Sequence, residues 1–179
     1  MLLATRRVYT GKVVRLDVDT VRFPDGSTGE LELIRHPGAA AVIPCASDPA
    51  GADPLILMIK QFRHAADGPM WEIPAGTLAP DEAPEACAHR ELREETGVVA
   101  ERIERLTSIY TTPGFTDEVI HLFLAQGLTQ GIAERERDEF IEVVPRSLSD
   151  VLAGIRSGEI RDAKTVVALL YMAGFILGL

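Results

Sequence analysis

The sequence predicts an α+β fold, and three features lead to this prediction. Several apolar runs have the length and composition of buried strands. One charged segment, residues 84–96, places Ala88 and Leu92 four positions apart, which is the spacing of an amphipathic helix. Segments of the two kinds follow one another in mixed order, so we expect strands and helices in one fold.

The composition is that of an ordinary soluble globular protein, with 46% hydrophobic and 25% charged residues in a chain of 179. This length is sufficient for one domain with a good core, or for one domain with an appendage. The formal net charge of −9 argues against binding to nucleic acid or to an acidic membrane through a general basic surface. An anionic substrate would therefore need metal ions or locally placed arginines.

The two cysteines, Cys45 and Cys87, form no disulfide framework and show no metal-ligand spacing, which fits a reducing cytosol. Residues 1–11 lack the long apolar stretch of a signal peptide. The apolar run 165–179 is shorter than the roughly 20 residues that a membrane-spanning helix needs, so we expect a buried terminal helix. The predicted location is the cytoplasm, with no membrane and no nucleic acid as partner.

The chain begins with a pattern typical of a β-hairpin. Residues 12–23 alternate apolar and polar side chains, with Leu16 and Val18 on one face. Residues 24–29 (PDGSTG) supply turn chemistry, and the apolar positions return in residues 30–34. We expect a small N-terminal unit built on this hairpin.

Turn residues at 35–39 mark a boundary, which divides the chain into an N-terminal β-domain, 1–38, and a main domain, 39–179. Ser147 or Ser149 can cap a short helix that Gly158 ends. The main domain contains further apolar runs that we expect to be strands, in residues 39–44, 54–62, 102–110, 118–126 and 140–145.

The charged helix has clear ends and an unusual face. Pro84 suits its first turn, and Gly97 suits the left-handed position that stops a helix. Glu91, Glu94 and Glu95 stand at i, i+3 and i+4, so their carboxylates share one face and repel one another. A solvated acidic face explains many such helices. The alternative is a site for a divalent ion, because carboxylate oxygens are ligands suited to Mg²⁺ or Mn²⁺.

Fixed residues recur at defined spacings in and around this helix. They are Gly76, Glu82, Arg90, Glu91, Leu92, Glu94, Glu95, Gly97 and Val98. This spacing resembles the Nudix box, G-x5-E-x7-R-E-U-x-E-E-x-G-U, where U is a bulky aliphatic residue, and it matches every fixed position of that pattern. The resemblance implies the Nudix fold, a mixed β-sheet sandwiched between α-helices. It also implies metal-dependent hydrolysis of a nucleoside diphosphate linked to another group.

In this family the glutamates that match Glu91, Glu94 and Glu95 hold the metals, and the one that matches Glu82 assists. The implied cofactor is Mg²⁺, with Mn²⁺ or another divalent cation as a substitute. Arg90 offers a planar guanidinium that can orient the neighbouring carboxylates. Arg90 and Glu94 are therefore expected to belong to the catalytic machinery as well.

The resemblance extends to the ADP-ribose pyrophosphatase subgroup, through WEIPAG before the box, QFRHA upstream and TTPGFTDE downstream. In that subgroup a proline lies about sixteen residues past the box, and Pro113 lies sixteen beyond Gly97. A small N-terminal β-domain exchanged between two subunits is also typical, so we expect a homodimer. The subgroup further implies a metal contact from the Ala75 carbonyl and substrate contacts from Arg35, Arg63, Gly114 and Phe115.

The general base is expected from one of two loops. By similarity it precedes the strand at residues 140–145, where Glu139 is the best match, with Glu134, Glu136 and Asp138 nearby. Glu118 is the second candidate, because its family counterpart lies near the diphosphate.

The expected reaction is the hydrolysis of ADP-ribose to AMP and ribose 5-phosphate. One alternative is another nucleoside diphosphate sugar or a dinucleotide, such as GDP-mannose or NADH. A triphosphatase for damaged nucleotides is a second alternative, although the N-terminal hairpin and PGFTDE count against it. The third is a non-catalytic module that senses ADP-ribose, although such a module can lose metal-ligand glutamates and this chain keeps them.

Overall fold

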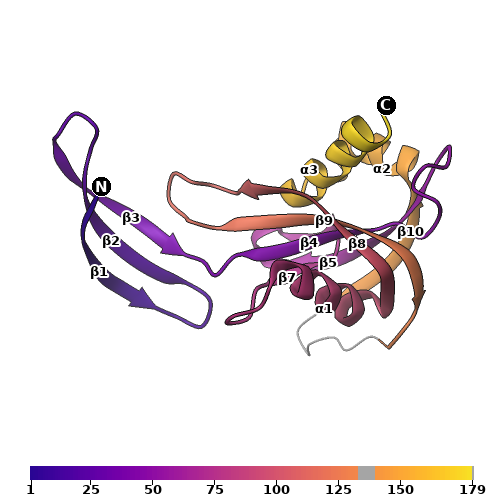
Figure 1. Ribbon diagram of the computed structural model, residues 1–179, viewed down its shortest axis with the longest axis horizontal. Helices are drawn as coiled ribbons and strands as arrows, with labels where there is room; N and C mark the ends of the chain where they lie inside the picture. The colour runs from indigo at the N-terminus through magenta and orange to yellow at the C-terminus, as the bar shows by residue number, and fades with distance from the viewer. Residues whose placement is uncertain (133–139, 179) are drawn as a thin grey trace.

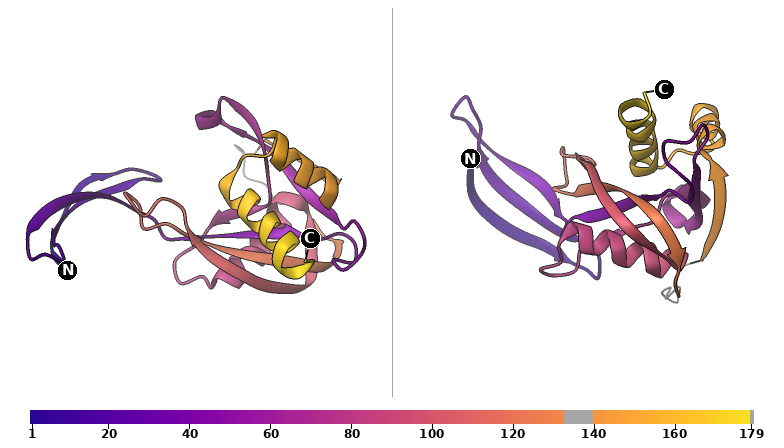
Figure 2. Two further views of the ribbon diagram at one scale, coloured as in Figure 1. Left: turned by 90° about the horizontal axis from the view of Figure 1, so that it is seen from above. Right: turned by 45° about the vertical axis from the view of Figure 1, so that its right-hand side comes forward.

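The computed structural model describes residues 1–132 and 140–178. A small N-terminal sheet stands apart from a larger body, in which sheets lie between helices (Figure 1). The same separation is visible in both views of Figure 2. The expected α+β class and the mixed-sheet architecture are confirmed.

The N-terminal sheet has three antiparallel strands in the order β1-β2-β3. They are β1 (Leu2–Thr10), β2 (Arg15–Arg22) and β3 (Thr28–Arg35). The expected hairpin corresponds to β2 and β3, whereas β1 was not expected. All nine residues of β1 are exposed, so this strand has no buried face that would produce alternation in the sequence.

The side chains that are most buried in the N-terminal sheet are not the apolar ones that the alternation in the sequence predicts. The most buried side chains of β2 are the acidic residues Asp17 and Asp19, while Leu16 and Val18 are only partly buried. Arg35 explains this burial, since its guanidinium donates to Asp17 at 3.0 Å and to Asp19 at 2.5 Å. Arg7 of β1 also donates to Asp17, so cationic side chains from both neighbouring strands replace the water around these carboxylates.

In its described residues, the body contains two sheets, three α-helices and two short helical turns. One sheet has the order β7-β4-β9-β8 and the other β10-β5-β6. The strands are β4 (Ala39–Pro44), β5 (Leu55–Arg63), β6 (Gly68–Glu72), β7 (Ala75–Thr77), β8 (Val98–Tyr110), β9 (Val119–Gln130) and β10 (Ile141–Ser147). The helices are α1 (Pro84–Thr96), α2 (Leu148–Ser157) and α3 (Ala163–Tyr171), and the turns are His64–Ala66 and Met172–Ile176.

Strand β4 lies at the centre of the four-stranded sheet and is buried on both faces. It pairs in parallel with β9, and the other pairings of that sheet are antiparallel. Val42 belongs to the apolar cluster beneath α1, which includes Leu92. Ile43, the next residue, points to the opposite face and packs in the larger cluster with Leu169 of α3. The sheet is therefore covered by α1 on one side and by α2 and α3 on the other (Figure 1).

The helix ends agree with the sequence analysis. Pro84 occupies the first turn of α1, and Gly97 ends that helix with φ +73°. The Ser147 side chain accepts a hydrogen bond from Asp150 N at the start of α2, and Gly158 ends α2 in the left-handed conformation. The cap expected from Ser147 or Ser149 is thus supplied by Ser147.

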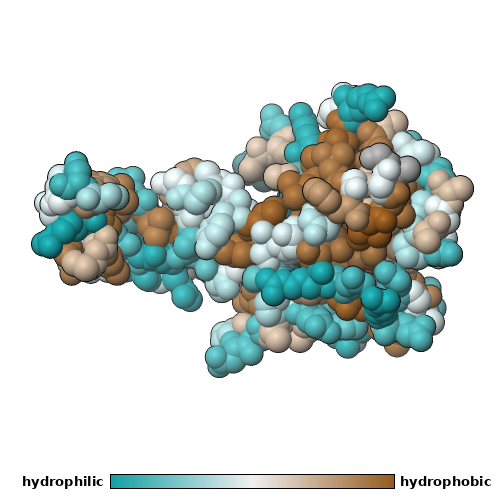
Figure 3. All heavy atoms as spheres, turned by 45° about the horizontal axis from the view of Figure 1, so that its top comes forward, coloured by the Kyte–Doolittle hydropathy of each residue, from teal (hydrophilic) through white to brown (hydrophobic). Residues whose placement is uncertain are grey.

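The C-terminal run is buried along one side only, which corrects the expectation of a buried terminal helix. Helix α3 ends at Tyr171, and a π-helical turn follows from Met172. Leu169 and Met172 are fully buried, but Phe175 is 80% exposed. Apolar surface is visible on this side of the body (Figure 3). Within the part of the chain that the structure describes, no helix has the length and apolar character needed to cross a membrane.

Candidate active site

A cavity of about 630 Å³ lies where α1, β5, β7, the β8–β9 loop and the start of α3 meet. It brings together many of the residues that the sequence analysis selected from distant segments. Those that line it are Arg63, Ala75, Gly76, Arg90, Glu91, Glu94, Glu95 and Glu118. Its lining also includes polar residues that the sequence analysis did not select, namely Gln61, Thr77, Thr111, Asp162 and Lys164.

Gly76 allows the acidic helix to approach strand β7 closely. A β-carbon at position 76 would lie 1.9 Å from Oε1 of Glu91, which is far inside van der Waals contact. Any side chain at this position would displace the Glu91 carboxylate from the cavity. Steric exclusion therefore explains why the first position of the motif is a glycine.

Arg90 is the centre of the acidic wall. Its Nε donates to Glu82 Oε1 at 2.8 Å, and its Nη2 donates to Glu82 Oε2 at 2.9 Å. Its Nη1 donates to Glu91 Oε1 at 2.5 Å and to Glu94 Oε2 at 3.0 Å. The hydrogen bonds from Arg90 are the main cause that lowers the pKa of Glu82 to about 2. One guanidinium thus offsets the repulsion among three carboxylates.

Glu95 is held differently from the other glutamates of α1. Its side chain is buried, and Oε2 accepts a hydrogen bond from Ala75 N at 3.0 Å. This bond joins α1 to β7 at the edge of the cavity.

The residues at this wall fit a divalent cation by their chemistry, since carboxylate oxygens from one face of a rigid helix suit Mg²⁺. Within the described residues, however, no three acidic, histidine or cysteine side chains converge closely enough to hold an ion in this arrangement. In this arrangement Arg90 donates to Glu91 and Glu94, and Ala75 N donates to Glu95.

A cationic wall faces the cavity from β5 and α3. Glu72 is buried and accepts two hydrogen bonds from Arg63, at 2.7 and 2.8 Å, and one from Lys164 Nζ at 2.5 Å. Lys164 also contacts Asp162 at 3.0 Å. Burial by itself would raise the pKa of Glu72, but Arg63 and Lys164 reverse this effect and lower it. Glu72 thus fixes two cations beside the cavity.

Lys164 and Asp162 were not found from the sequence. Asp162 accepts a hydrogen bond from Thr165 N and caps α3, a role that an acidic residue before an apolar helical run could have indicated. For Lys164 we find no such signal, because it contacts Glu72 across 92 positions of the chain. Packing of α3 against the sheets is what brings it to the cavity.

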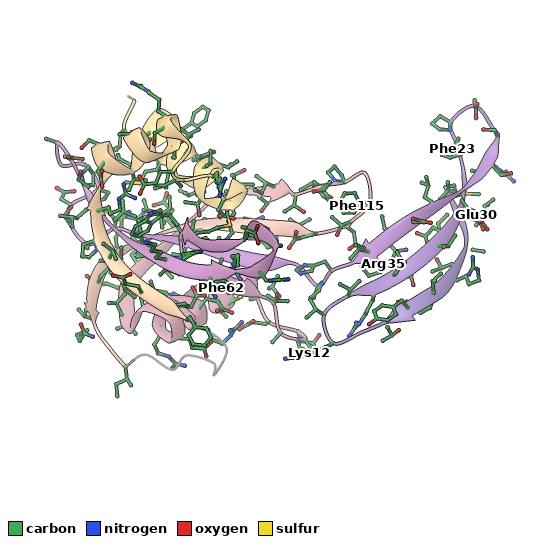
Figure 4. The ribbon with its side chains drawn as sticks, turned by 180° about the vertical axis from the view of Figure 1, so that it is seen from behind. Lys12, Phe23, Glu30, Arg35, Phe62 and Phe115 are labelled. Carbon is green, nitrogen blue, oxygen red and sulfur yellow. The ribbon has the colours of Figure 1, made fainter. Side chains whose placement is uncertain are left out.

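Glu118 enters the cavity from the β8–β9 loop. Its Oε2 accepts a hydrogen bond from Thr111 Oγ1 at 2.7 Å, and both residues belong to the lining. Gly114 and Phe115 lie farther along this loop and do not line the cavity. Phe115 is exposed and lies at the tip of the loop, which extends towards the end of β3 (Figure 4).

Arg35 also lies outside the main cavity. In addition to Asp17 and Asp19, it donates to Asp117 at 3.2 Å, and it lines a second cavity of about 430 Å³ between the N-terminal sheet and the β7–α1 segment. Contacts of Arg35, Gly114 and Phe115 with a substrate remain predictions. Glu139 and its neighbours Glu134, Glu136 and Asp138 lie outside the described residues.

Comparison with known proteins gives the class to which this fold and site belong. A family model described as the NUDIX domain matches residues 35–166. The chain belongs to the Nudix family, and the resemblance inferred from Gly76 to Val98 is confirmed.

Two bacterial relatives are similar over nearly the entire chain. One is the ADP-ribose pyrophosphatase of Bacillus subtilis (strain 168), 41% identical over 172 residues that cover 95% of this chain and 90% of the relative. The other is the methanol dehydrogenase activator of Bacillus methanolicus, with the same identity and coverage. A solved structure described as an ADP compounds hydrolase aligns with a TM-score of 0.85 and 19% identity, covering 99% of this chain and 94% of its own. That structure supports the fold.

Proposed function

We propose that this protein hydrolyses the diphosphate bond of ADP-ribose, giving AMP and ribose 5-phosphate, with divalent cations. The observation that carries the proposal is the composition of one cavity. One wall presents Glu91, Glu94 and Glu95, and another presents Arg63 and Lys164. A diphosphate needs both metal ligands and cations in a protein whose net charge is −9. The similarity to an ADP-ribose pyrophosphatase supports this substrate.

The metal is proposed to be Mg²⁺, which Mn²⁺ or another divalent cation can replace. Glu91, Glu94 and Glu95 would hold it, together with the main chain of Ala75, and Glu82 would assist. When bound, the cation supplies charge screening for the diphosphate and makes water easier to deprotonate. Arg90 would then keep Glu82 in place and limit the repulsion among the carboxylates.

The remaining residues act on the substrate and on protons. Arg63 is proposed to bind a phosphate group, because its guanidinium is fixed by Glu72 beside the cavity and is still 41% exposed. Lys164 adds a second positive charge at the same wall. Glu139 is the first candidate for the general base and Glu118 the second, and only Glu118 lies within the described residues.

We also propose a cytoplasmic homodimer in which residues 1–38 are exchanged between subunits. The N-terminal sheet supports this, because it exposes large apolar side chains and stands apart from the body (Figure 2). These exposed side chains include Leu2, Leu3, Val8, Tyr9 and Leu31. The buried side chains of this sheet are the acidic Asp17 and Asp19, so the sheet buries little apolar area by itself, and a partner subunit would supply the missing surface.

A second candidate function is activation of a dehydrogenase, which the similarity to a methanol dehydrogenase activator favours. The two functions are compatible if activation depends on the same hydrolytic site. They differ if the site only binds ADP-ribose. Retention of Glu91, Glu94, Glu95 and Arg90 around the cavity favours hydrolysis.

The proposal is tested by incubating the purified protein and Mg²⁺ with ADP-ribose, GDP-mannose, NADH and 8-oxo-dGTP, followed by chromatography of the products. We expect the highest kcat/KM for ADP-ribose, with AMP and ribose 5-phosphate in equal amounts. A higher kcat/KM for GDP-mannose or NADH would identify that compound, and not ADP-ribose, as the preferred substrate. Tight binding of ADP-ribose without any product would favour the alternative that the protein is a non-catalytic module that senses ADP-ribose.

A further inference from the structure

The β8–β9 loop is attached to the end of the N-terminal sheet by its main chain. Ile34 N donates to Phe115 O at 2.8 Å, and Asp117 N donates to Ile34 O at 3.3 Å. Ile34 and Thr116 form a parallel bridge at this point. Figure 4 shows Phe115 at the loop tip, close to Arg35 at the end of β3. The loop that carries Glu118 therefore takes its position from the junction between the two parts of the chain.

Asp117 fixes this junction with both of its carboxylate oxygens. Oδ1 accepts a hydrogen bond from His36 N at 2.7 Å, and Oδ2 accepts one from Arg35 Nη1 at 3.2 Å. Hydrogen bonds to an ionised carboxylate are stronger than those between neutral groups. The main chain at His36 is consequently held against the loop that contains Glu118.

The imidazole ring of His36 completes the link. Gly38 N donates to Nδ1 at 3.1 Å, so Nδ1 is an acceptor and Nε2 is the ring nitrogen that carries hydrogen. Nε2 lies 3.5 Å from Oε1 of Glu118. The other oxygen of Glu118 accepts the hydrogen bond from Thr111. Each oxygen of this carboxylate thus faces a donor.

We propose that His36 is a positioning residue that holds the Glu118 carboxylate in the active-site cavity. His36 does not line that cavity, whereas Glu118 does, so His36 acts through Glu118. The inference rests on the proposed function and adds that the N-terminal sheet controls an active-site carboxylate through Asp117 and His36. Among the described residues, Thr111 would then be the remaining side chain that bonds the Glu118 carboxylate, so more rotamers of Glu118 would be populated without the imidazole.

The first test compares two replacements of His36 that differ in reach. Asparagine places its amide near the position of Nδ1, and glutamine places its amide near the position of Nε2. His36→Asn should lower the turnover of ADP-ribose by roughly tenfold or more, because small misplacements of active-site groups cost large factors. His36→Gln should recover most of the loss. His89→Asn, at an exposed position of α1, is the matched control and should retain wild-type turnover.

The second test asks whether the effect passes through Glu118. In a Glu118→Ala background, His36→Asn should cause little further loss, since the carboxylate that His36 positions is already absent. An equal loss in both backgrounds would indicate a general structural role and would overturn the inference. A Glu118→Ala variant with normal turnover would overturn it as well.

The third test does not depend on activity. Crystal structures of the wild type and of His36→Asn should show the Glu118 carboxylate displaced or disordered only in the variant. An unchanged Glu118 carboxylate, still bonded to Thr111, would overturn the inference even if the protein hydrolyses ADP-ribose. A wild type that does not cleave ADP-ribose would instead overturn the proposed function, and the crystal structures would still decide the role of His36.

Discussion

Arg90 donates hydrogen bonds to both carboxylate oxygens of Glu82, at 2.8 Å from Nε and 2.9 Å from Nη2. Its remaining nitrogen, Nη1, contacts Glu91 and Glu94. The planar guanidinium is the only common side chain that can make such a fork and still donate in a third direction. The acidic wall of the cavity is therefore organised by one cation on the same helix.

The first prediction follows from this fork. Arg90→Lys keeps the charge but cannot bond Glu82 in two places while also contacting Glu91 and Glu94. The Mg²⁺ concentration for half-maximal activity should rise by roughly tenfold, since groups that orient metal ligands are worth about 10–100-fold in affinity. A Mg²⁺ titration of ADP-ribose hydrolysis measures this. Arg102→Lys, at an exposed position of β8, should need the same Mg²⁺ concentration for half-maximal activity as the wild type. If Arg90→Lys also leaves this concentration unchanged, the proposed role of Arg90 is wrong.

The second prediction concerns the metal ligands. Exhaustive chelation should abolish hydrolysis, because the acidic wall would repel a diphosphate. Glu94→Gln and Glu95→Gln should each lower turnover by roughly a hundredfold or more, since each removes a charge that stabilises the cation. Steady-state kinetics with circular dichroism separates lost activity from lost folding. Glu85→Gln, on the exposed first turn of the same helix, should behave normally, and full activity after chelation would refute the mechanism.

The third prediction distinguishes the two candidates for the general base. Glu139→Gln at saturating Mg²⁺ should lower turnover by roughly 10²–10⁴ with little change in substrate affinity, which is the usual contribution of general-base assistance. Glu118→Gln is measured in parallel, and Glu142→Gln on β10 is the control. Loss of turnover in Glu118→Gln alone would transfer the role of base to Glu118. If both variants keep their turnover, neither carboxylate is the base.

The fourth prediction is that the protein is a homodimer at micromolar concentration. The large apolar side chains exposed on the N-terminal sheet need a partner surface. Light scattering should report twice the chain mass, and Leu31→Glu should shift the protein towards the monomer because Leu31 is among these exposed side chains. Glu30→Gln, the neighbouring substitution, should leave the dimer intact. A monomeric wild type would exclude the exchange of residues 1–38.

The fifth prediction uses the pKa of Glu72, which lies below its ordinary value of 4.5. Burial opposes this shift, and the cations Arg63 and Lys164 produce it. A carboxyl group whose pKa is lowered by folding stabilises the protein above pH 4.5, and this contribution disappears as the pH falls through the folded-state pKa.

Glu72→Gln should therefore lower the free energy of unfolding at pH 7 by about 2–3 kcal/mol, somewhat less than for a fully buried pair because Arg63 is partly exposed. The difference from the wild type should narrow below pH 4.5. Urea unfolding between pH 7 and pH 3 measures both effects. Glu104→Gln, which removes an exposed partner of Arg102, should leave stability unchanged. If the difference in unfolding free energy between wild type and Glu72→Gln stays constant across this pH range, the Glu72 carboxylate is not stabilised by Arg63 and Lys164 as described.

The sequence by itself determined the acidic helix and its chemistry. Helical periodicity places Glu91, Glu94 and Glu95 on one face, and Pro84 and Gly97 define the ends of the helix. These features depend on residues within a few positions of one another, so the physical rules of one helix are sufficient to predict them. The motif then identified the family, which the match to residues 35–166 confirms.

Only the tertiary structure decided which distant residues complete the site. It placed Lys164 beside Glu72, and it placed His36 against Asp117 across 81 positions of the chain. It also buried Asp17, whereas the alternation in the sequence predicts that the apolar residues of the same strand are buried. Contacts of this kind depend on the register of β4 with β9 and on how α3 packs against the sheets. No local pattern carries that information, because the side chains become neighbours only after the chain has folded.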